Sequence, residues 1–136
     1  MNLILDTDHC IAILRGSLDV SQRVPADAEL FVTVITVTEL IYGAYKSELP
    51  DHNLQQVNLL LQGVAVLPLE EVAARRCGQL KDRLRRMGTP LAEPDLQIAA
   101  IALQHDLPLA THNQRHFGRV PELQLIDWLE TRRSQQ

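Results

Sequence analysis

The sequence has 136 residues, of which 46% are hydrophobic and 22% charged, and its formal net charge is −4 at pH 7. This is the composition of a globular chain rather than a mainly disordered one, and the length predicts a single domain over residues 1–136. The negative charge excludes a protein that coats nucleic acid by bulk positive charge, because phosphate contacts from Lys and Arg supply most non-specific affinity. A nucleic-acid enzyme is not excluded, since an acidic active site itself lowers the net charge.

The cysteine content and the absence of long apolar runs indicate the cell compartment. Cys10 and Cys77 are the only cysteines, too few for the disulfide framework of a small secreted protein. The segment Met1–Asp6 has no basic leader and reaches an acidic residue too early for a signal peptide, and no later apolar run approaches membrane-spanning length. We therefore expect a cytoplasmic protein.

The first half of the sequence predicts two strands, each followed by helical segments. Leu3–Leu5 is short and uniformly apolar, as expected for a strand that is covered on both faces. The run Leu30–Ile35 is rich in β-branched residues and predicts the second strand. Apolar residues then take helical spacing from Thr36 and again after Pro50, which predicts a helical hairpin.

The second half of the sequence predicts shorter strands between two well-marked helices. One helix begins near Glu70 and ends at Gly88, a typical helix terminator. Pro94 opens the other, whose segment Asp95–Gln104 is apolar almost all round, so we expect it to be the most buried helix. Further strands are predicted at Val64–Leu67, at Leu107–Ala110 and, as a short fifth, at Leu123–Ile126.

This alternation of strands and helices predicts the α/β class. We expect a short, mostly parallel sheet of four to five strands, with right-handed crossovers and helices on both faces. In open parallel sheets the ligand crevice lies beyond the carboxyl ends of the strands. Polar residues that directly follow the strands are therefore the candidates for a functional site.

Acidic residues occupy several of these positions. Asp6 and Asp8 follow the first strand, Glu39 follows the second, and Asp95 opens the helix that leads into the fourth. Each has a structural alternative: Asp6 or Asp8 would cap a helix, Glu39 would complete a capping box with Thr36, and Asp95 would complement a helix dipole. Carboxylates that converge, however, must share protons or bind a cation. We expect Asp6, Glu39 and Asp95 to form one acidic pocket that binds a divalent metal ion.

The residue types at this pocket favour a hard cation. The ligands are all oxygen, and no Cys or His pair stands at metal-ligand spacing, so Mg²⁺ or Mn²⁺ is favoured over Zn²⁺. Such an ion lowers the pKa of a bound water, and a nearby carboxylate can accept the proton. The chemistry predicted for the site is phosphodiester hydrolysis.

Four short motifs occur in order along the chain, at Leu5–Asp8, Thr38–Ala44, Pro94–Ala100 and Ala110–Phe117. Together they resemble the PIN-domain ribonucleases, and most closely their VapC-like toxin branch from bacterial toxin-antitoxin pairs. The resemblance covers essentially the whole chain. It implies an Mg²⁺- or Mn²⁺-dependent endoribonuclease that acts on RNA, has Asp6, Glu39 and Asp95 as its acidic core, is inhibited by a small antitoxin protein and is usually dimeric. Within the second motif, we interpret Tyr42, Gly43 and Ala44 as helix-packing residues.

The chain departs from the family pattern after the fourth strand, where many members carry a further acidic residue. Candidates to replace that fourth acid are Asn113, His116, Asp8 and Glu93. The hydroxyl groups of Thr7 and Thr111 could orient Asp6 or a metal-bound water.

Two other functions are compatible with parts of the sequence. The missing fourth acid allows a catalytically impaired PIN-like module that binds RNA or a protein without cleaving it. The spacing of Asp6 and Asp8 resembles the nucleophile and acid of haloacid dehalogenase-type phosphatases. That chemistry asks for Thr or Val where Cys10 stands.

Overall fold

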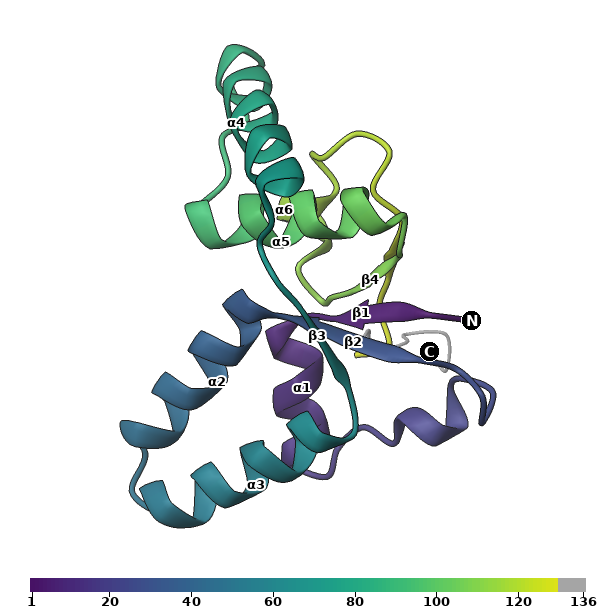
Figure 1. Cartoon of the computed structure of the whole chain (residues 1–136), viewed down its shortest axis with the longest axis vertical. Coiled ribbons are helices and arrows are strands. Elements are labelled where there is room, and N and C mark those ends of the chain that lie inside the picture. Colours follow the sequence, from purple (N-terminus) through teal and green to yellow (C-terminus); the bar gives the residue numbers. More distant parts are fainter. Residues whose placement is uncertain (130–136) are drawn as a thin grey trace, which may run out of the picture.

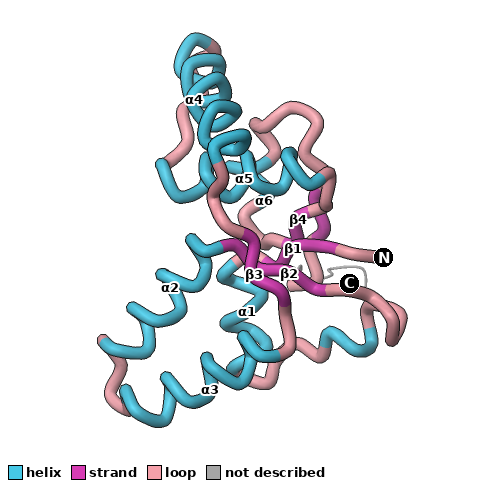
Figure 2. Tube along the Cα trace, in the orientation of Figure 1, coloured by secondary structure: helices cyan, strands magenta, loops and turns pink. Residues whose placement is uncertain are grey.

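The computed structural model describes residues 1–129 and has a five-stranded sheet with helices on both faces (Figures 1 and 2). In chain order the elements are β1 (Leu3–Leu5), α1 (Thr7–Leu14), a 3-10 helix (Val20–Gln22), β2 (Leu30–Thr33), α2 (Val34–Tyr45), α3 (Pro50–Gln62), β3 (Ala65–Leu67), α4 (Glu71–Arg86), α5 (Glu93–His105), β4 (Leu109–Ala110), α6 (Gln114–Phe117) and β5 (Leu125–Ile126). The predicted α/β class is confirmed.

The sheet has the strand order β3-β2-β1-β4-β5, and all neighbouring strands are parallel. Strand β1 lies in the middle, with Leu3 opposite Leu30 of β2 and Ile4 opposite Leu109 of β4. The chain passes from β1 to β2 and β3 on one side, and only later adds β4 and β5 on the other. The strand order therefore reverses between β1 and β4, which is where open α/β sheets form their crevice.

Side chains of β1 alternate between the two faces of the sheet, and each face has its own core. Leu3 and Leu5 pack into the cluster that includes α1, α2 and α3, whereas Ile4 packs into the cluster formed by α4, α5 and α6. Figure 1 shows α1 to α3 on one side of the sheet and α4 and α5 on the other. The predicted burial of α5 is confirmed, because its segment 98–102 is almost entirely inaccessible.

The start of α2 differs from the sequence prediction. Strand β2 ends at Thr33, and Val34 and Ile35 are already helical. The Thr33 hydroxyl accepts a hydrogen bond from the Thr36 amide at 3.3 Å and so caps the helix. Thr36 is therefore not the N-cap, and the predicted capping box with Glu39 is wrong.

Other expectations for individual elements have mixed outcomes. The helical hairpin of α2 and α3 is confirmed by their packing, and Gly88, at φ +75°, ends α4 as predicted. Ala44 is buried, but Tyr42 is 64% exposed, so its predicted role in helix packing is wrong. The short helix α6 was not predicted. Within residues 1–129, no helix combines the length and apolar character needed to cross a membrane.

Candidate active site

Asp6 stands at the carboxyl end of β1 and is the N-cap of α1. Its Oδ1 accepts a hydrogen bond from the Thr7 amide at 2.8 Å, and its Oδ2 accepts one from the Thr111 hydroxyl, just after β4, at 2.7 Å. The side chain is 7% exposed. Asp6 is thus fixed at the switch point of the sheet by one group from the start of α1 and one that follows β4.

The environment of Asp6 disfavours its charge. Burial raises the pKa of Asp6 to about 6, although the hydrogen bond from Thr111 acts in the opposite direction. The negative charges of Asp8 and Asp95 raise the pKa further. A buried carboxylate with acidic neighbours gains from a bound cation.

Glu39 comes from α2 and is exposed on the surface. Its Oε1 accepts a hydrogen bond from the Thr7 hydroxyl at 2.6 Å, and the same hydroxyl lies 3.1 Å from that of Thr36. The carboxylate therefore does not cap its own helix. Instead, it is held by Thr7, the first residue of α1 and the neighbour of Asp6 in the chain.

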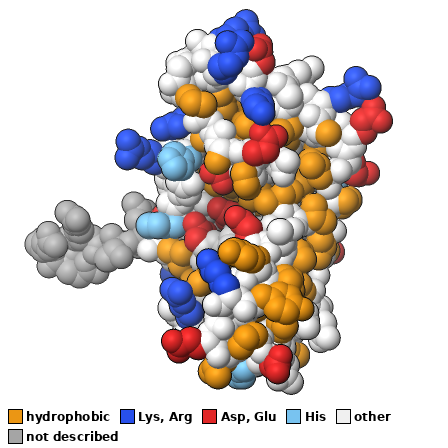
Figure 3. Space-filling model, turned by 90° about the vertical axis from the view of Figure 1, so that its left-hand side faces the viewer, with side chains coloured by type: hydrophobic (Ala, Val, Ile, Leu, Met, Phe, Trp, Pro, Cys, Tyr) orange, Lys and Arg blue, Asp and Glu red, His pale blue; other side chains and the backbone are white. Residues whose placement is uncertain are grey.

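Asp95 lies half-buried in the first turn of α5. Burial raises the pKa of this carboxyl, the nearby His116 lowers it, and the charges of Glu39 and Asp8 raise it again. Asp95 is thus within range of the charges of Glu39 and Asp8, and its own charge acts on Asp6. Figure 3 shows acidic side chains gathered in the middle of one face, with histidine and basic side chains beside them.

Asp8 is held by hydrogen bonds on both oxygens. Its Oδ1 lies 2.7 Å from Nδ1 of His9, and its Oδ2 accepts from the His112 amide at 2.9 Å and lies 3.3 Å from the Thr111 hydroxyl. Burial raises the pKa of Asp8, but the hydrogen bonds from His9 and His112 outweigh it and hold the pKa below its usual value. A phosphatase would need this residue as a proton donor, so that alternative does not fit.

The remaining candidates for the fourth acidic position lie in different places. Glu93 forms an exposed ion pair with Lys81 of α4 at 3.0 Å. His116 of α6 is close enough to Asp95 to affect its pKa. The backbone amide of Asn113 donates a hydrogen bond to the Thr111 hydroxyl at 3.1 Å. Asn113 is therefore connected to Asp6 through Thr111.

The oxygen donors of the site are of the kind that binds a metal ion, but they do not form a complete set of ligands. Within residues 1–129, no three His, Cys, Asp or Glu side chains stand close enough together to make a complete metal site. The donors around Asp6 are carboxylate and hydroxyl oxygens, which match Mg²⁺ or Mn²⁺. Mg²⁺ usually keeps several waters and binds through one or two carboxylates, so it does not require a complete set of protein ligands.

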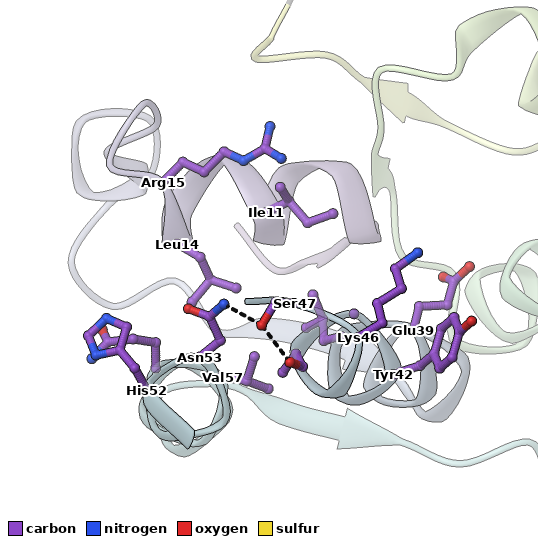
Figure 4. A pocket seen from close by; sticks show the side chains of 14 residues that line it. Ile11, Leu14, Arg15, Glu39, Tyr42, Lys46, Ser47, His52, Asn53 and Val57 are labelled. Carbon is purple, nitrogen blue, oxygen red and sulfur yellow. Dashed lines mark hydrogen bonds between the residues drawn. The ribbon is translucent and has the colours of Figure 1, made fainter. Parts of the chain in front are cut away.

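A groove adjoins the acidic face between α1, α2 and α3. It has a volume of about 680 Å³ and ends at Glu39. Figure 4 shows Ile11 and Leu14 of α1 opposite Val57 of α3. The turn between α2 and α3 is held by a hydrogen bond from the Asn53 amide to the Ser47 hydroxyl at 2.8 Å. The groove thus combines apolar side chains with one carboxylate, Glu39, and with the basic side chains of Arg15 and Lys46.

The sequence and the fold match one known family. The PIN domain family matches residues 3–123, and the chain therefore belongs to the PIN-domain family. Its similarity to VapC proteins extends over nearly its whole length. It is 34% identical to the "tRNA(fMet)-specific endonuclease VapC" of Salmonella typhimurium, covering 94% of this chain and 98% of the relative. It is also 34% identical to "Ribonuclease VapC2" of Haemophilus influenzae, covering 95% and 99%.

Solved structures of VapC-containing complexes have the same fold. DNA-bound VapBC from Salmonella typhimurium gives a TM-score of 0.87 at 34% identity, covering 94% of this chain and 98% of that one. VapBC-1 from nontypeable Haemophilus influenzae gives 0.86 at 30% identity, covering 96% and 100%. The fold expected from the resemblance is confirmed, and the chain is VapC-like.

One residue at the site was missed in the sequence. His9 is fully buried and contacts Asp8. In the sequence it is a lone histidine at the start of a helix, a position that usually signals nothing more than packing. Its second partner, Trp128, lies 119 residues away, so no local pattern could have revealed the contact.

Proposed function

We propose that this protein is a metal-dependent endoribonuclease that hydrolyses RNA phosphodiester bonds and is the toxin of a toxin-antitoxin pair. The observation that carries the proposal is the buried Asp6 carboxylate at the switch point: burial and then the charges of Asp8 and Asp95 raise its pKa, and the adjacent Thr7 hydroxyl holds Glu39. The names of the relatives as ribonucleases support it.

In this proposal the chain's own residues have distinct roles. Asp6 and Asp95 would hold Mg²⁺ or Mn²⁺, and the Thr111 hydroxyl keeps Oδ2 of Asp6 in place. The bound ion would supply an acidified water and neutralise charge on the phosphate. Glu39, exposed and oriented by Thr7, is the carboxylate best placed to accept a proton. Exposed Arg115 and His116 of α6 would contact the phosphate backbone.

The test is cleavage of purified RNA with Mg²⁺, with Mn²⁺ or with a chelator, starting from initiator transfer RNA because one relative is named for it. Asp95→Asn should lower the cleavage rate by a factor of about 10² or more, as the loss of a catalytic group does. Glu93→Gln is the matched control: it removes an acid from the same helix turn, but one that is paired with Lys81. Its cleavage rate should equal that of the unchanged protein.

Other outcomes would favour different functions. Equal activity with and without the chelator would rule out the metal-dependent mechanism. RNA binding without cleavage in either ion, unchanged by Asp95→Asn, would favour the catalytically impaired binding module.

We also propose a cognate antitoxin as protein partner. Similar solved structures are VapBC complexes, and the groove between α1, α2 and α3 offers an apolar surface next to the acidic face. An antitoxin segment in this groove would reach the site at Glu39. An antitoxin bound in the groove would block access of RNA to the carboxylates.

Two further features belong to the same proposal. A homodimer is supported by exposed apolar side chains on the edge strand β3, in the turn after it and in the first turn of α4, at Val66, Leu69 and Val72. Sedimentation velocity would measure this state directly. A cytoplasmic location fits Cys10 and Cys77, which are buried as free thiols.

A further inference from the structure

His9 lies fully buried between the acidic site and the segment that follows β5. Its Nε2 is 3.1 Å from the backbone amide of Trp128, and its Nδ1 is 2.7 Å from Oδ1 of Asp8. A backbone N–H can only donate, so Nε2 must accept and carries no proton. The ring proton therefore sits on Nδ1 and points at Asp8.

Asp8 in turn contacts the residues that follow β4. With Oδ1 held by His9, Oδ2 faces the His112 amide at 2.9 Å and the Thr111 hydroxyl at 3.3 Å. The Thr111 hydroxyl has one proton to donate, and its shorter contact is with Oδ2 of Asp6 at 2.7 Å. Asp8 thus fixes the backbone position from which Thr111 holds Asp6.

The segment after β5 contacts this arrangement at two points. The His112 ring lies 3.0 Å from Oδ2 of Asp127, and the ring of Trp128 packs against that of His9 with 5.9 Å between centroids. Three strand ends, those of β1, β4 and β5, therefore meet in one chain of hydrogen bonds. His9 is fully buried and, like His112, has partners near both ends of the described chain.

We propose that His9 is a positioning residue for the metal site. Through its Nδ1–H it orients Asp8, which places Thr111 and thereby keeps the Asp6 carboxylate ready to bind the ion. Partners behind a metal ligand commonly change metal affinity or activity by about 10–100-fold when they are lost. The inference rests on the proposed metal-dependent function.

Two substitutions separate the contacts of the ring. In His9→Gln the longer side chain reaches the position of Nε2, keeping an acceptor for Trp128 and losing the donor to Asp8. In His9→Asn the shorter amide reaches the position of Nδ1, keeping the donor to Asp8 and losing the contact with Trp128. We expect His9→Gln to weaken binding of Mn²⁺ alone, measured by calorimetry, by about 10–100-fold. His9→Asn should bind Mn²⁺ almost as the unchanged protein does.

RNA cleavage gives a second measurement on the same variants. The turnover number kcat should fall in His9→Gln and be largely retained in His9→Asn, with KM for RNA unchanged in both, because the ring does not face the RNA. Equal Mn²⁺ affinities for the two variants, or a loss confined to His9→Asn, would overturn the inference and reduce His9 to a core residue.

A third measurement does not depend on folding of the variants or on metal. Nitrogen-15 NMR of the unchanged protein should show His9 protonated at Nδ1 and unprotonated at Nε2, and the opposite tautomer would overturn the inference. Failure of the proposed function has a different signature. In that case the unchanged protein would cleave no RNA, while the Mn²⁺ affinities of the two variants and the tautomer would still decide the role of His9.

Discussion

At the scale of single residues, the pKa of the Asp6 carboxyl group is set by opposing effects of its surroundings. Two hydrogen bonds stabilise its charged form, yet burial and two acidic neighbours prevail and raise its pKa to about 6. An ion that binds here would remove the unfavourable interaction. The charge of Asp6 therefore lowers the stability of the metal-free protein and favours binding of a cation.

The pH dependence of stability should reveal this cost. The pKa of Asp6 rises from 3.8 to about 6 on folding, so the folded state binds the proton more tightly than the unfolded chain does. The cost of ionising Asp6 therefore appears as the pH rises above the unfolded pKa and is complete above the folded one, where it amounts to about 3 kcal/mol. Asp6→Asn removes the charge and can keep the contact with the Thr7 amide.

Urea unfolding in the presence of a chelator measures the effect. Asp6→Asn should be more stable than the unchanged protein at about pH 8, by up to about 3 kcal/mol, and the difference should vanish toward about pH 4. A less stable variant at the higher pH, or a difference that does not change with pH, would contradict the electrostatic account.

The sequence identified Asp6, Glu39 and Asp95 as candidates because each follows a strand or opens a helix at the same edge of a parallel sheet. It also indicated that the Thr111 hydroxyl could orient Asp6, but it did not identify Thr7 as the partner of Glu39. Thr111 is 105 residues from Asp6, and Thr7 is 32 residues from Glu39. Such contacts depend on the strand order, which local patterns do not contain.

At the scale of elements, the first turn of α2 determines where Glu39 points. The β-branched residues Val34 and Ile35 have strand propensity, which is why the sequence predicted a longer strand. The hydrogen bond between the Thr33 hydroxyl and the Thr36 amide begins the helix there instead. Local propensity was overridden by a cap and by tertiary packing.

A pair of isosteric substitutions tests which threonine caps α2. Thr33→Val removes the hydroxyl that accepts from the helix and should cost about 1 kcal/mol of unfolding free energy. Thr36→Val removes a hydroxyl whose partner is the Thr7 side chain rather than the backbone, and should cost less. Urea unfolding of both variants provides the comparison, and a larger loss for Thr36→Val would restore the capping box predicted from the sequence.

At the scale of the whole molecule, the periodicity of the sequence was sufficient to predict a parallel α/β sheet and a buried α5. It gave no indication of the groove, because three helices that are separate in sequence must pack before the groove exists. Tyr42 is an example. Its position in a helical motif predicted a packing role, whereas the structure places it, largely exposed, among the residues that line the groove.

Two tyrosines of α2 allow a matched test of the groove as the antitoxin site. Tyr42 and Tyr45 are each 64% exposed, but only Tyr42 lines the groove, with the Lys46 ammonium 5.0 Å from its ring centroid. Tyr42→Ala should weaken antitoxin binding by about tenfold or more, as for an aromatic interface residue. Tyr45→Ala should leave it unchanged.

Calorimetry with the purified cognate antitoxin measures both affinities. If the two substitutions had equal effects, or if only Tyr45→Ala weakened binding, the antitoxin would have to bind elsewhere.

The hydrogen bond between Thr111 and Asp6 has a further consequence for synthesis of the protein. Asp6 leaves the ribosome early, but it cannot be fixed until β4 has been made and has paired with β1, 105 residues later in the chain. Contacts of such long sequence separation form slowly, because the loop between them must close first. A growing chain therefore carries its acidic residues without an assembled site, and the cell that translates it meets an active nuclease only once nearly the whole chain has emerged.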